Sequence, residues 1–307
     1  MKYYLGIDGG GTKTKVCLMD ESMTIIGFGN GGPSSIDTVD QKTTLKSIRT
    51  SLLELNPDLI DLTHIDGIFA GLGGVVTEND KLALQELLRD LPYTDDSTLI
   101  KVENDVINAL ASGERGEFGM VLIVGTGMVA YGRNQDGLTH KSGGWGYKEG
   151  DAGSSYDLGY QSIKTVIRAF DKRIPASGFT DAVAESLGMR EAKDIVAIMD
   201  KLWGHRTNIA SLAPLVTKYA NQGDSNAKAI IDAATDELAL CVKAVYQNID
   251  LPHSHLVVVG SLGNAEGYFK TQLHEKIHSI DSKIEIVSQA IDPAYAAAKI
   301  ALRNRMI

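Results

Sequence analysis

The sequence predicts an α/β protein of two lobes that arose by duplication of one folding unit. The chain has 307 residues, which is long for a single core because domains cluster at about 100 to 150 residues. Short apolar runs alternate with amphipathic stretches of helical period. A strand that ends in a glycine turn occurs at residues 5–12 and again at 121–128, and a second alternating strand follows each. Taken alone, the repeat could also be explained by two unrelated hairpins with glycine turns.

Strands are expected where apolar residues, many of them β-branched, occur in short runs. Period-two alternation after each glycine turn adds a second strand to each copy of the repeat. The six apolar runs are residues 3–7, 65–70, 99–102, 120–124, 256–259 and 284–287.

Helices are expected where apolar residues recur every three or four positions. The first covers about residues 40–55 and closes before Pro57. The second begins with a capping-box-like pair, Thr77 and Asp80, and runs through leucines to Pro92. Further helices dominate residues 155–248, with breaks near Pro175, Gly188, Gly204 and Gly223.

The lobe boundary is expected near Gly113 to Gly119, where small and charged residues interrupt the pattern. This divides the chain into an N-terminal lobe at 1–115 and a larger, more helical lobe at 116–291. A last helix at about 292–307 is expected to return to the first lobe.

Composition excludes some classes of partner. The formal net charge is −9 and the pI about 5.3, whereas nucleic acids and anionic membranes require a basic surface. The chain enters an apolar run without the charged start of a signal peptide, and no run has membrane-spanning length. Cys17 and Cys241 lie far apart in apolar patterns, as buried thiols of a reducing cytosol do. We expect a cytoplasmic protein.

The first glycine turn, Asp8 to Thr14, fits neither common phosphate-binding motif. A P-loop needs lysine directly after its last glycine and then a helix, and a dinucleotide fingerprint also needs a helix. Here the residues after the glycines alternate with the period of a strand. Exposed backbone N–H groups of such a turn can surround phosphate oxygens, and Asp8 can hold a magnesium-bound water. The alternative is a structural turn with a solvated Asp and Lys. The expected phosphate contacts are Gly9, Gly10, Gly11, Thr12 and Lys13.

The second turn, Gly125-Thr126-Gly127, is by itself equally consistent with a plain turn and a ligand site. As the second copy of a repeat it predicts a second phosphate contact.

Five short motifs occur in a fixed order over the first half of the chain. Together they resemble the BadF/BadG-type ATPase family, which includes N-acetylglucosamine kinases. The resemblance implies the duplicated ribonuclease-H-like lobe pair shared with actin and hexokinase, ATP and Mg²⁺ in the cleft between the lobes, and a homodimer. The motifs are the DGGGTKT opening at 8–14, Glu103-Asn104-Asp105, Gly125-Thr126-Gly127, Gly143-Gly144-Trp145-Gly146 and Gly150-Asp151-Ala152-Gly153-Ser154.

Asp105 is the candidate catalytic residue. It follows the strand at 99–102 and opens a helix at 106–111, so it lies at the carboxyl end of a strand, where open α/β sheets bind ligands. Aspartate is also a common helix N-cap, which is the alternative. The resemblance implies that Asp105 is the general base that accepts the proton of the attacking sugar hydroxyl.

The glycine-rich stretch at 142–155 is the candidate sugar loop. It combines Trp145 with acidic residues, and an aromatic ring with carboxylates suits the apolar face and hydroxyl edge of a sugar. Trp145 as a core anchor is the alternative. The resemblance implies a sugar site lined by Gly144, Trp145 and Asp151, with Asn104 at the reacting end and the loop that carries Ser34 and Ser35 closing over it.

Two departures from the family leave the sugar open. Ser35 stands where many relatives have asparagine, and Met128 where they have serine. Both positions can touch the 2-substituent of the sugar, so acetylglucosamine, acetylmuramic acid, glucosamine and other hexosamines all remain candidates. The loop after the strand at 256–259 is implied to pack against adenosine through Gly260, Ser261, Gly263 and Asn264, with an ordinary strand-to-helix turn as the alternative.

These features predict an ATP-dependent kinase that phosphorylates a hydroxyl, the 6-OH, of an N-acetylhexosamine. Two alternatives remain: an ATPase that activates a radical dehydratase through an iron–sulfur cluster, and a noncatalytic sugar sensor. The first needs exposed loop cysteines, whereas Cys17 and Cys241 fall in strand and helix patterns.

Overall fold

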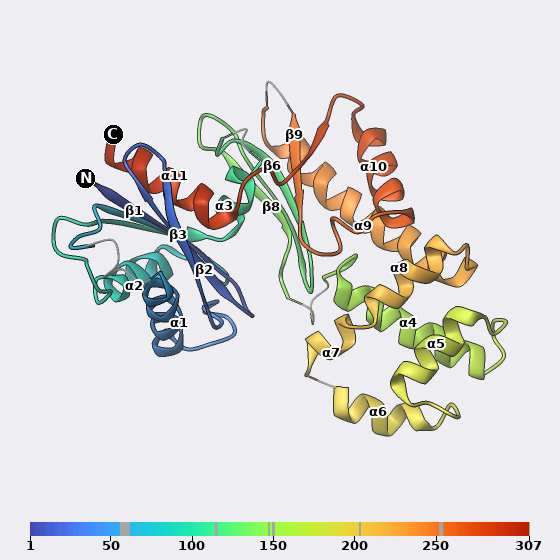
Figure 1. Cartoon of the computed structure of the whole chain (residues 1–307). Coiled ribbons are helices and arrows are strands. Elements are labelled where there is room, and N and C mark those ends of the chain that lie inside the picture. Colours follow the sequence, from blue (N-terminus) through green and yellow to red (C-terminus); the bar gives the residue numbers. More distant parts are fainter. Residues whose placement is uncertain are drawn as a thin grey trace. The chain divides into compact units, whose positions relative to one another are not determined.

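The structure is a computed structural model that describes residues 1–55, 62–113, 116–146, 148, 151–202, 204–251 and 254–306. The chain forms two compact units, Met1–Glu117 with Gln289–Ile307, and Phe118–Ser288 (Figure 1). The expected helix end at Pro57 and the loop residues Glu149 and Gly150 lie outside the described residues. No helix in the described ranges is long and apolar enough to cross a bilayer.

The first unit contains a five-stranded sheet in the order β3-β2-β1-β4-β5. The first three strands form an antiparallel meander, and β4 and β5 run parallel to β1. The parallel strands β1, β4 and β5 therefore end together at one edge of the sheet, which is where open α/β sheets commonly bind ligands. The strands are β1 (Tyr3–Gly9), β2 (Thr14–Asp20), β3 (Ile25–Gly31), β4 (Gly67–Leu72) and β5 (Leu99–Asn104).

The second unit repeats this topology. Its sheet has the order β10-β9-β6-β7-β8, again with a three-stranded meander followed by two strands parallel to the first. Each glycine hairpin thus begins at the central strand of the same five-stranded pattern, which excludes two unrelated hairpins. The strands are β6 (Gly119–Val124), β7 (Met128–Arg133), β8 (Thr139–Gly143), β9 (His255–Val259) and β10 (Glu285–Ser288).

Helices cover both faces of the first sheet (Figure 1). Asp40 caps α1 by accepting from the backbone N–H of Thr43, and the expected capping box of Thr77 and Asp80 starts α2. On the other face, α11 packs against β1, β2 and β4. The helices are α1 (Gln41–Glu54), α2 (Glu78–Leu88), α3 (Val106–Ala111) and α11 (Pro293–Met306).

The second unit is mainly helical, as its sequence predicts. The long helix α9 packs on β6, β7 and β8, and α10 packs on α9. Gly188 ends α5 in the left-handed conformation, at one of the expected breaks. The helices are α4 (Ser155–Phe170), α5 (Gly178–Leu187), α6 (Asp194–Leu202), α7 (Arg206–Ala210), α8 (Ala213–Asn221), α9 (Ser225–Asn248) and α10 (Tyr268–Ile280).

Two strands and one helix end differ from expectation. The strand β3 was not expected because glycine disfavours strands, but a Cβ on Gly29 or Gly31 would lie 1.8 or 2.3 Å from a backbone oxygen of α1. Glycine at these two positions therefore allows α1 to pack directly against β3. The polar strand β8 pairs on one edge only and carries no apolar run. The helix α2 ends at Leu88 rather than near Pro92, although buried Leu91 continues the apolar period beyond it.

Close packing at Gly6 fixes α11 on the first sheet. A Cβ at Gly6 would lie 2.0 Å from the carbonyl oxygen of Ala294 and 2.2 Å from the backbone nitrogen of Ala298. Both obstacles are backbone atoms, so no side-chain rotation can relieve the overlap.

Gly6→Ala should therefore lower the free energy of unfolding by about 3 kcal/mol, the upper end of the usual cost of overpacking, because α11 must move off β1. Urea denaturation of the purified variant measures this. Gly178→Ala is the control, since its Cβ would only touch a ring atom of Tyr219 at 3.4 Å at the start of α5. A Gly6→Ala protein as stable as the wild type would contradict the packing.

Candidate active site

Asp8 and Asp105 are brought to one edge of the first sheet by strand register. Asp8 pairs with Gly71 across β1 and β4, and Leu72 pairs with Asn104 across β4 and β5. Asp105 follows Asn104 directly. Because these parallel strands end together, the edge carries two carboxylates beside a run of glycines after β4.

The first glycine turn connects β1 to β2 at this edge. The N–H of Gly10 donates to the carbonyl of Lys13 at 3.0 Å, which closes the turn and leaves Gly11, Thr12 and Lys13 exposed. An exposed turn without bulky side chains next to Asp8 has the geometry that phosphate binding requires.

The Ser34 and Ser35 loop packs against this turn. The backbone N–H groups of both serines donate to the carbonyl of Gly10, at 3.0 and 3.2 Å. The buried Ser34 hydroxyl accepts from Thr14 Oγ1 at 2.7 Å, and the Ser35 hydroxyl donates to Asp37. Both hydroxyls are thus engaged within the protein, and the loop supports the glycine turn.

Asp105 occupies the N-cap position of α3, but its side chain does not cap the helix. Asn104 does that work, because its Oδ1 accepts from the N–H of Val106 at 3.1 Å while its Nδ2 donates to the carbonyl of Val75. The N-cap alternative for the Asp105 carboxylate is therefore wrong. The Asp105 carboxylate accepts instead from the backbone N–H groups of Val106 and of Asp105 itself, and it lies beside Gly73.

Burial raises the pKa of Asp105 to about 7, and the charges of Asp8 and Asp37 add to the shift. Burial likewise raises the pKa of Asp8 to about 6, aided by Asp292 and opposed by a hydrogen bond from Asn108. Lys13 and Lys15 partly offset the negative charge at Asp8. The edge therefore holds more negative charge than the protein itself neutralises.

The residues at this edge fit Mg²⁺ held together with phosphates. Mg²⁺ keeps several waters and typically takes one or two carboxylates plus substrate oxygens. No group of three His, Cys, Asp or Glu side chains suited to a metal occurs among the described residues, so an all-protein metal cage is not formed there. The partly buried carboxylate of Asp8 supplies the expected kind of donor.

The second glycine turn lies at the corresponding end of β6. The N–H of Gly125 donates to the carbonyl of Gly127 at 2.9 Å, and the carbonyl of Gly125 accepts from the N–H of Ser155 at the start of α4. The turn is therefore anchored to a helix N-terminus.

Asp151 lies under this turn. A Cβ on Gly127 would lie 2.9 Å from an oxygen of Asp151, and the carboxylate accepts from the backbone N–H groups of Gly146 and Met128. Burial raises the pKa of Asp151, opposed first by the charge of Arg206. Its carboxylate supports the loop on which the candidate sugar residues stand.

Trp145 is 67% exposed, so its interpretation as a core anchor is wrong. The ammonium of Lys141 lies 4.1 Å from the centre of its ring and donates to the carbonyl of Gly144. An exposed indole on a loop, with one face held by a cation, is available to a ligand.

Met128 does not occupy the position expected of it. Its side chain is 4% exposed and belongs to the core of the second unit. The prediction that residue 128 touches the sugar 2-substituent is therefore wrong, because alternation along β7 directs this side chain into the core.

The loop at Gly260 to Asn264 joins the end of β9 to the end of β6. The N–H groups of Leu262 and Gly263 donate to the carbonyl of Val124, at 3.1 and 3.0 Å. In the first unit, the N–H of Gly73 donates to the carbonyl of Gly9 at 2.8 Å. The two units thus build their glycine loops alike. Asn264 Nδ2 donates to the carbonyl of Gly260, and Ser261 is exposed.

Sequence reasoning missed Asn108 and Asp37. Asn108 follows Asp105 by one helical turn, so helix period was the available signal. Asp37 lies in an irregular loop and carried no periodic signal.

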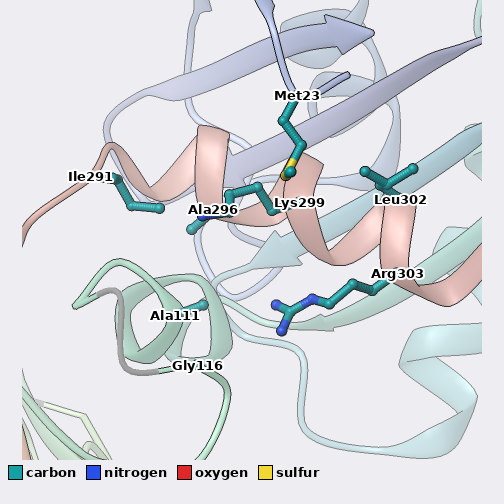
Figure 2. Close-up of a pocket in the computed structure, with 8 residues that line it drawn as sticks. All are labelled: Met23, Ala111, Gly116, Ile291, Ala296, Lys299, Leu302 and Arg303. Atoms are coloured by element: carbon teal, nitrogen blue, oxygen red, sulfur yellow. The ribbon is translucent and has the colours of Figure 1, made fainter. Parts of the chain in front are cut away.

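A cavity of about 190 Å³ in the first unit is not this site (Figure 2). None of the residues predicted to bind ligand lines it. Its lining combines two cations of α11 with mainly apolar residues: Met23, Ala111, Gly116, Ile291, Ala296, Lys299, Leu302 and Arg303.

The raised pKa of Asp105 predicts a pH-dependent stability. The folded protein binds a proton on Asp105 more tightly than the unfolded chain does. The stability that this protonation gives the folded state is fully present below the unfolded-state pKa near 4 and is lost as pH rises through about 7. Ligand-free Asp105→Asn should be more stable than the wild type by on the order of 2 kcal/mol at pH 8, and the gain should shrink towards pH 5. Urea unfolding at both pH values measures it. A difference independent of pH would contradict the burial of this charge.

Known proteins match the chain along its whole length. Residues 5–301 match the BadF/BadG/BcrA/BcrD ATPase family. An N-acetylmuramic acid/N-acetylglucosamine kinase of Clostridium acetobutylicum is 31% identical over 306 residues, covering 98% of each chain. An N-acetyl-D-glucosamine kinase of Dictyostelium discoideum is 29% identical over 318 residues, also covering 98% of each.

A solved structure confirms the predicted fold class. The Chromobacterium violaceum protein, solved as a candidate N-acetylglucosamine kinase, superposes with a TM-score of 0.77 at 24% identity, covering 98% of this chain and 99% of the other. The fold is therefore the duplicated two-lobe α/β fold that the motifs implied. With the match over residues 5–301 and a relative at 31% identity over 98% of its length, the chain belongs to the BadF/BadG/BcrA/BcrD ATPase family.

Proposed function

We propose that this protein is a carbohydrate kinase that transfers the γ-phosphoryl group of ATP to the 6-hydroxyl of an N-acetylhexosamine. The observation that carries the proposal is Asp105: a partly buried carboxylate with a pKa raised to about 7, which does not cap α3 and lies at the same sheet edge as Asp8 and a glycine turn. Full-length similarity to two amino-sugar kinases supports the substrate class.

Asp105 is assigned the role of general base. A base with a pKa near the working pH combines a sufficient ionised fraction with the ability to take a proton in the transition state. The carboxylate accepts the proton of the attacking hydroxyl as that oxygen bonds to the γ-phosphorus and the bond from phosphorus to the bridging oxygen breaks, which releases ADP. Phosphoryl transfer otherwise depends on positioning and on stabilising charge.

The glycine turns are assigned to the nucleotide. Gly9, Gly10, Gly11, Thr12 and Lys13 contact phosphate oxygens in this proposal, with Lys13 adding a positive charge. Asp8 would hold Mg²⁺ through a water, and the ion would neutralise phosphate charge. The turn at Gly125, Thr126 and Gly127 also contacts phosphate, and Gly260, Ser261, Gly263 and Asn264 contact adenosine.

The sugar is assigned to Trp145 and to the loops around Asn104 and Ser35. The exposed indole offers an apolar face, and Asn104 adjoins the base. Ser34, Ser35 and Asp151 form hydrogen bonds within the protein, so in this proposal they set the shape of the loops that meet the sugar. We extend the proposal to acetylglucosamine and acetylmuramic acid, because the Clostridium relative is named for both.

Cysteine chemistry does not support the iron–sulfur alternative. Cys17 is fully buried in β2, where burial raises the pKa of its thiol to about 12, and Cys241 is half-buried in α9 with a raised pKa. Cluster ligands must be accessible thiolates. Two free thiols of this kind also suit the cytoplasm, and we place the enzyme there as a homodimer, by resemblance for the latter.

Asp105→Asn should lower kcat by about 100-fold to 10,000-fold with little change in sugar KM, because it removes proton acceptance and keeps the shape of the side chain. The assay incubates Mg²⁺-ATP with acetylated, free and lactyl amino sugars and follows sugar phosphate by mass spectrometry. NMR of the product locates the phosphate.

Asp136→Asn, in the exposed turn between β7 and β8, is the matched control and should keep wild-type kcat. ATP turnover without any sugar phosphate would refute the kinase. A fully active Asp105→Asn would refute the base.

A further inference from the structure

Asn108 links the two carboxylates of the candidate site. It is fully buried in α3, and its Nδ2 donates to the carbonyl of Ile7 at 2.9 Å and to Asp8 Oδ1 at 3.0 Å. The carbonyl of Gly71 lies at 3.5 Å from the same nitrogen. One amide group thus holds the ends of β1 and β4 against α3.

The sheet leaves room for this side chain. A Cβ on Gly71 would lie 2.3 to 2.5 Å from the three terminal atoms of the Asn108 amide. Gly71 faces Asp8 across the ladder, so the space that a β4 side chain normally fills is occupied by the amide. Any larger residue at either position displaces the other.

The side-chain amide of Asn108 leaves one of its own polar atoms without a hydrogen bond. Asn108 Oδ1 is buried and has no hydrogen-bond partner in the described part of the chain. Burying an unpaired acceptor costs free energy, which an apolar side chain of the same shape avoids. Three oxygens surround the nitrogen, so the reversed orientation would oppose oxygen to oxygen. The donor side of the amide is therefore the feature that the site uses.

Asn108 also ties Asp8 to the helix that Asp105 begins. The two residues Asp105 and Asn108 lie on one turn of α3, where the N–H of Ala109 donates to the carbonyl of Asp105 at 3.1 Å. Asn108 binds the Asp8 carboxylate directly. Because Asp8 and Asp105 repel one another, this tie holds together groups that would otherwise separate.

We propose that Asn108 is a positioning residue that fixes the Asp8 carboxylate, binding one oxygen inward and leaving the second for the water on Mg²⁺. It touches neither nucleotide nor sugar. This inference rests on the proposed function, because it gives the Asp8 carboxylate the metal role assigned above. Residues behind a metal site commonly change metal affinity by about 10-fold to 100-fold when replaced.

Asn108→Leu is the direct test, since leucine fills a similar space and cannot donate. Binding of Mn²⁺ with a non-hydrolysable ATP analogue, followed by electron paramagnetic resonance, should weaken by about 10-fold to 100-fold. The kcat should fall while sugar KM stays within about twofold. Asn134→Ala is the control: Asn134 is also buried, but its Oδ1 accepts from Leu138 in the turn after β7, and Mn²⁺ binding should be unchanged.

A paired substitution separates positioning from space filling. Asn108→Ala alone leaves a hole, and Gly71→Ala added to it returns a methyl group to that hole. If Asn108 only fills space, the double variant should recover Mn²⁺ binding. The proposal expects both variants to bind Mn²⁺ weakly, because neither supplies a donor to Asp8.

Wild-type Mn²⁺ affinity in Asn108→Leu, or its recovery in the double variant, would overturn the inference. Failure of the proposed function gives a different result: the wild type would bind Mn²⁺ with the ATP analogue and form no sugar phosphate. Thermal unfolding of each variant identifies any loss of binding that comes from misfolding.

Discussion

Partly buried negative charge at the end of the first sheet is the constraint on which the site depends. Asp8 and Asp105 lie where β1 and β5 end, burial raises the pKa of both, and neither forms an ion pair with another described residue. Removing a carboxylate from water costs free energy, so neighbouring groups must keep it in place. Here the holding elements are the strand register, the Asn108 amide and the close packing of α11 at Gly6. A bound cation would relieve the repulsion and could at the same time bind phosphate oxygens, which is why this edge suits a metal–nucleotide ligand.

Duplication supplied two copies of the scaffold, and only one carries the acids. The repeat places Val124 of the second unit at the position of Asp8, so the end of β6 is apolar where the end of β1 is charged. Both units still tie the loop after their fourth strand to the end of the first strand through backbone hydrogen bonds. The two units thus share a backbone arrangement but differ in the side chains that they carry at the ends of β1 and β6. The first unit holds the base and metal candidates, and the second holds Trp145 and a glycine turn anchored to α4.

The sequence predicted those features that depend on local pattern. Apolar runs located the central and parallel strands, and the predicted capping box at Thr77 forms as its residue types require. The glycine-rich strand β3 was not predicted. Its glycines are needed because α1 packs against them, and local strand propensity does not report such tertiary packing. Met128 was misplaced for a similar reason, since its position after a turn suggested a ligand contact and its strand register directs it to the core. The motif was sufficient to select Asp105 as a candidate. Only the structure shows that Asn104, rather than Asp105, caps α3 with its side chain.

The central claim is that Asp105 and Asp8 serve the two reacting ends of one phosphoryl transfer. A crystal structure of the protein with Mg²⁺, a non-hydrolysable ATP analogue and N-acetylglucosamine tests it most directly. The account predicts the sugar 6-hydroxyl within hydrogen-bond distance of Asp105 and a magnesium-bound water on Asp8. A sugar bound with no hydroxyl near Asp105, or a metal held away from Asp8, would contradict it.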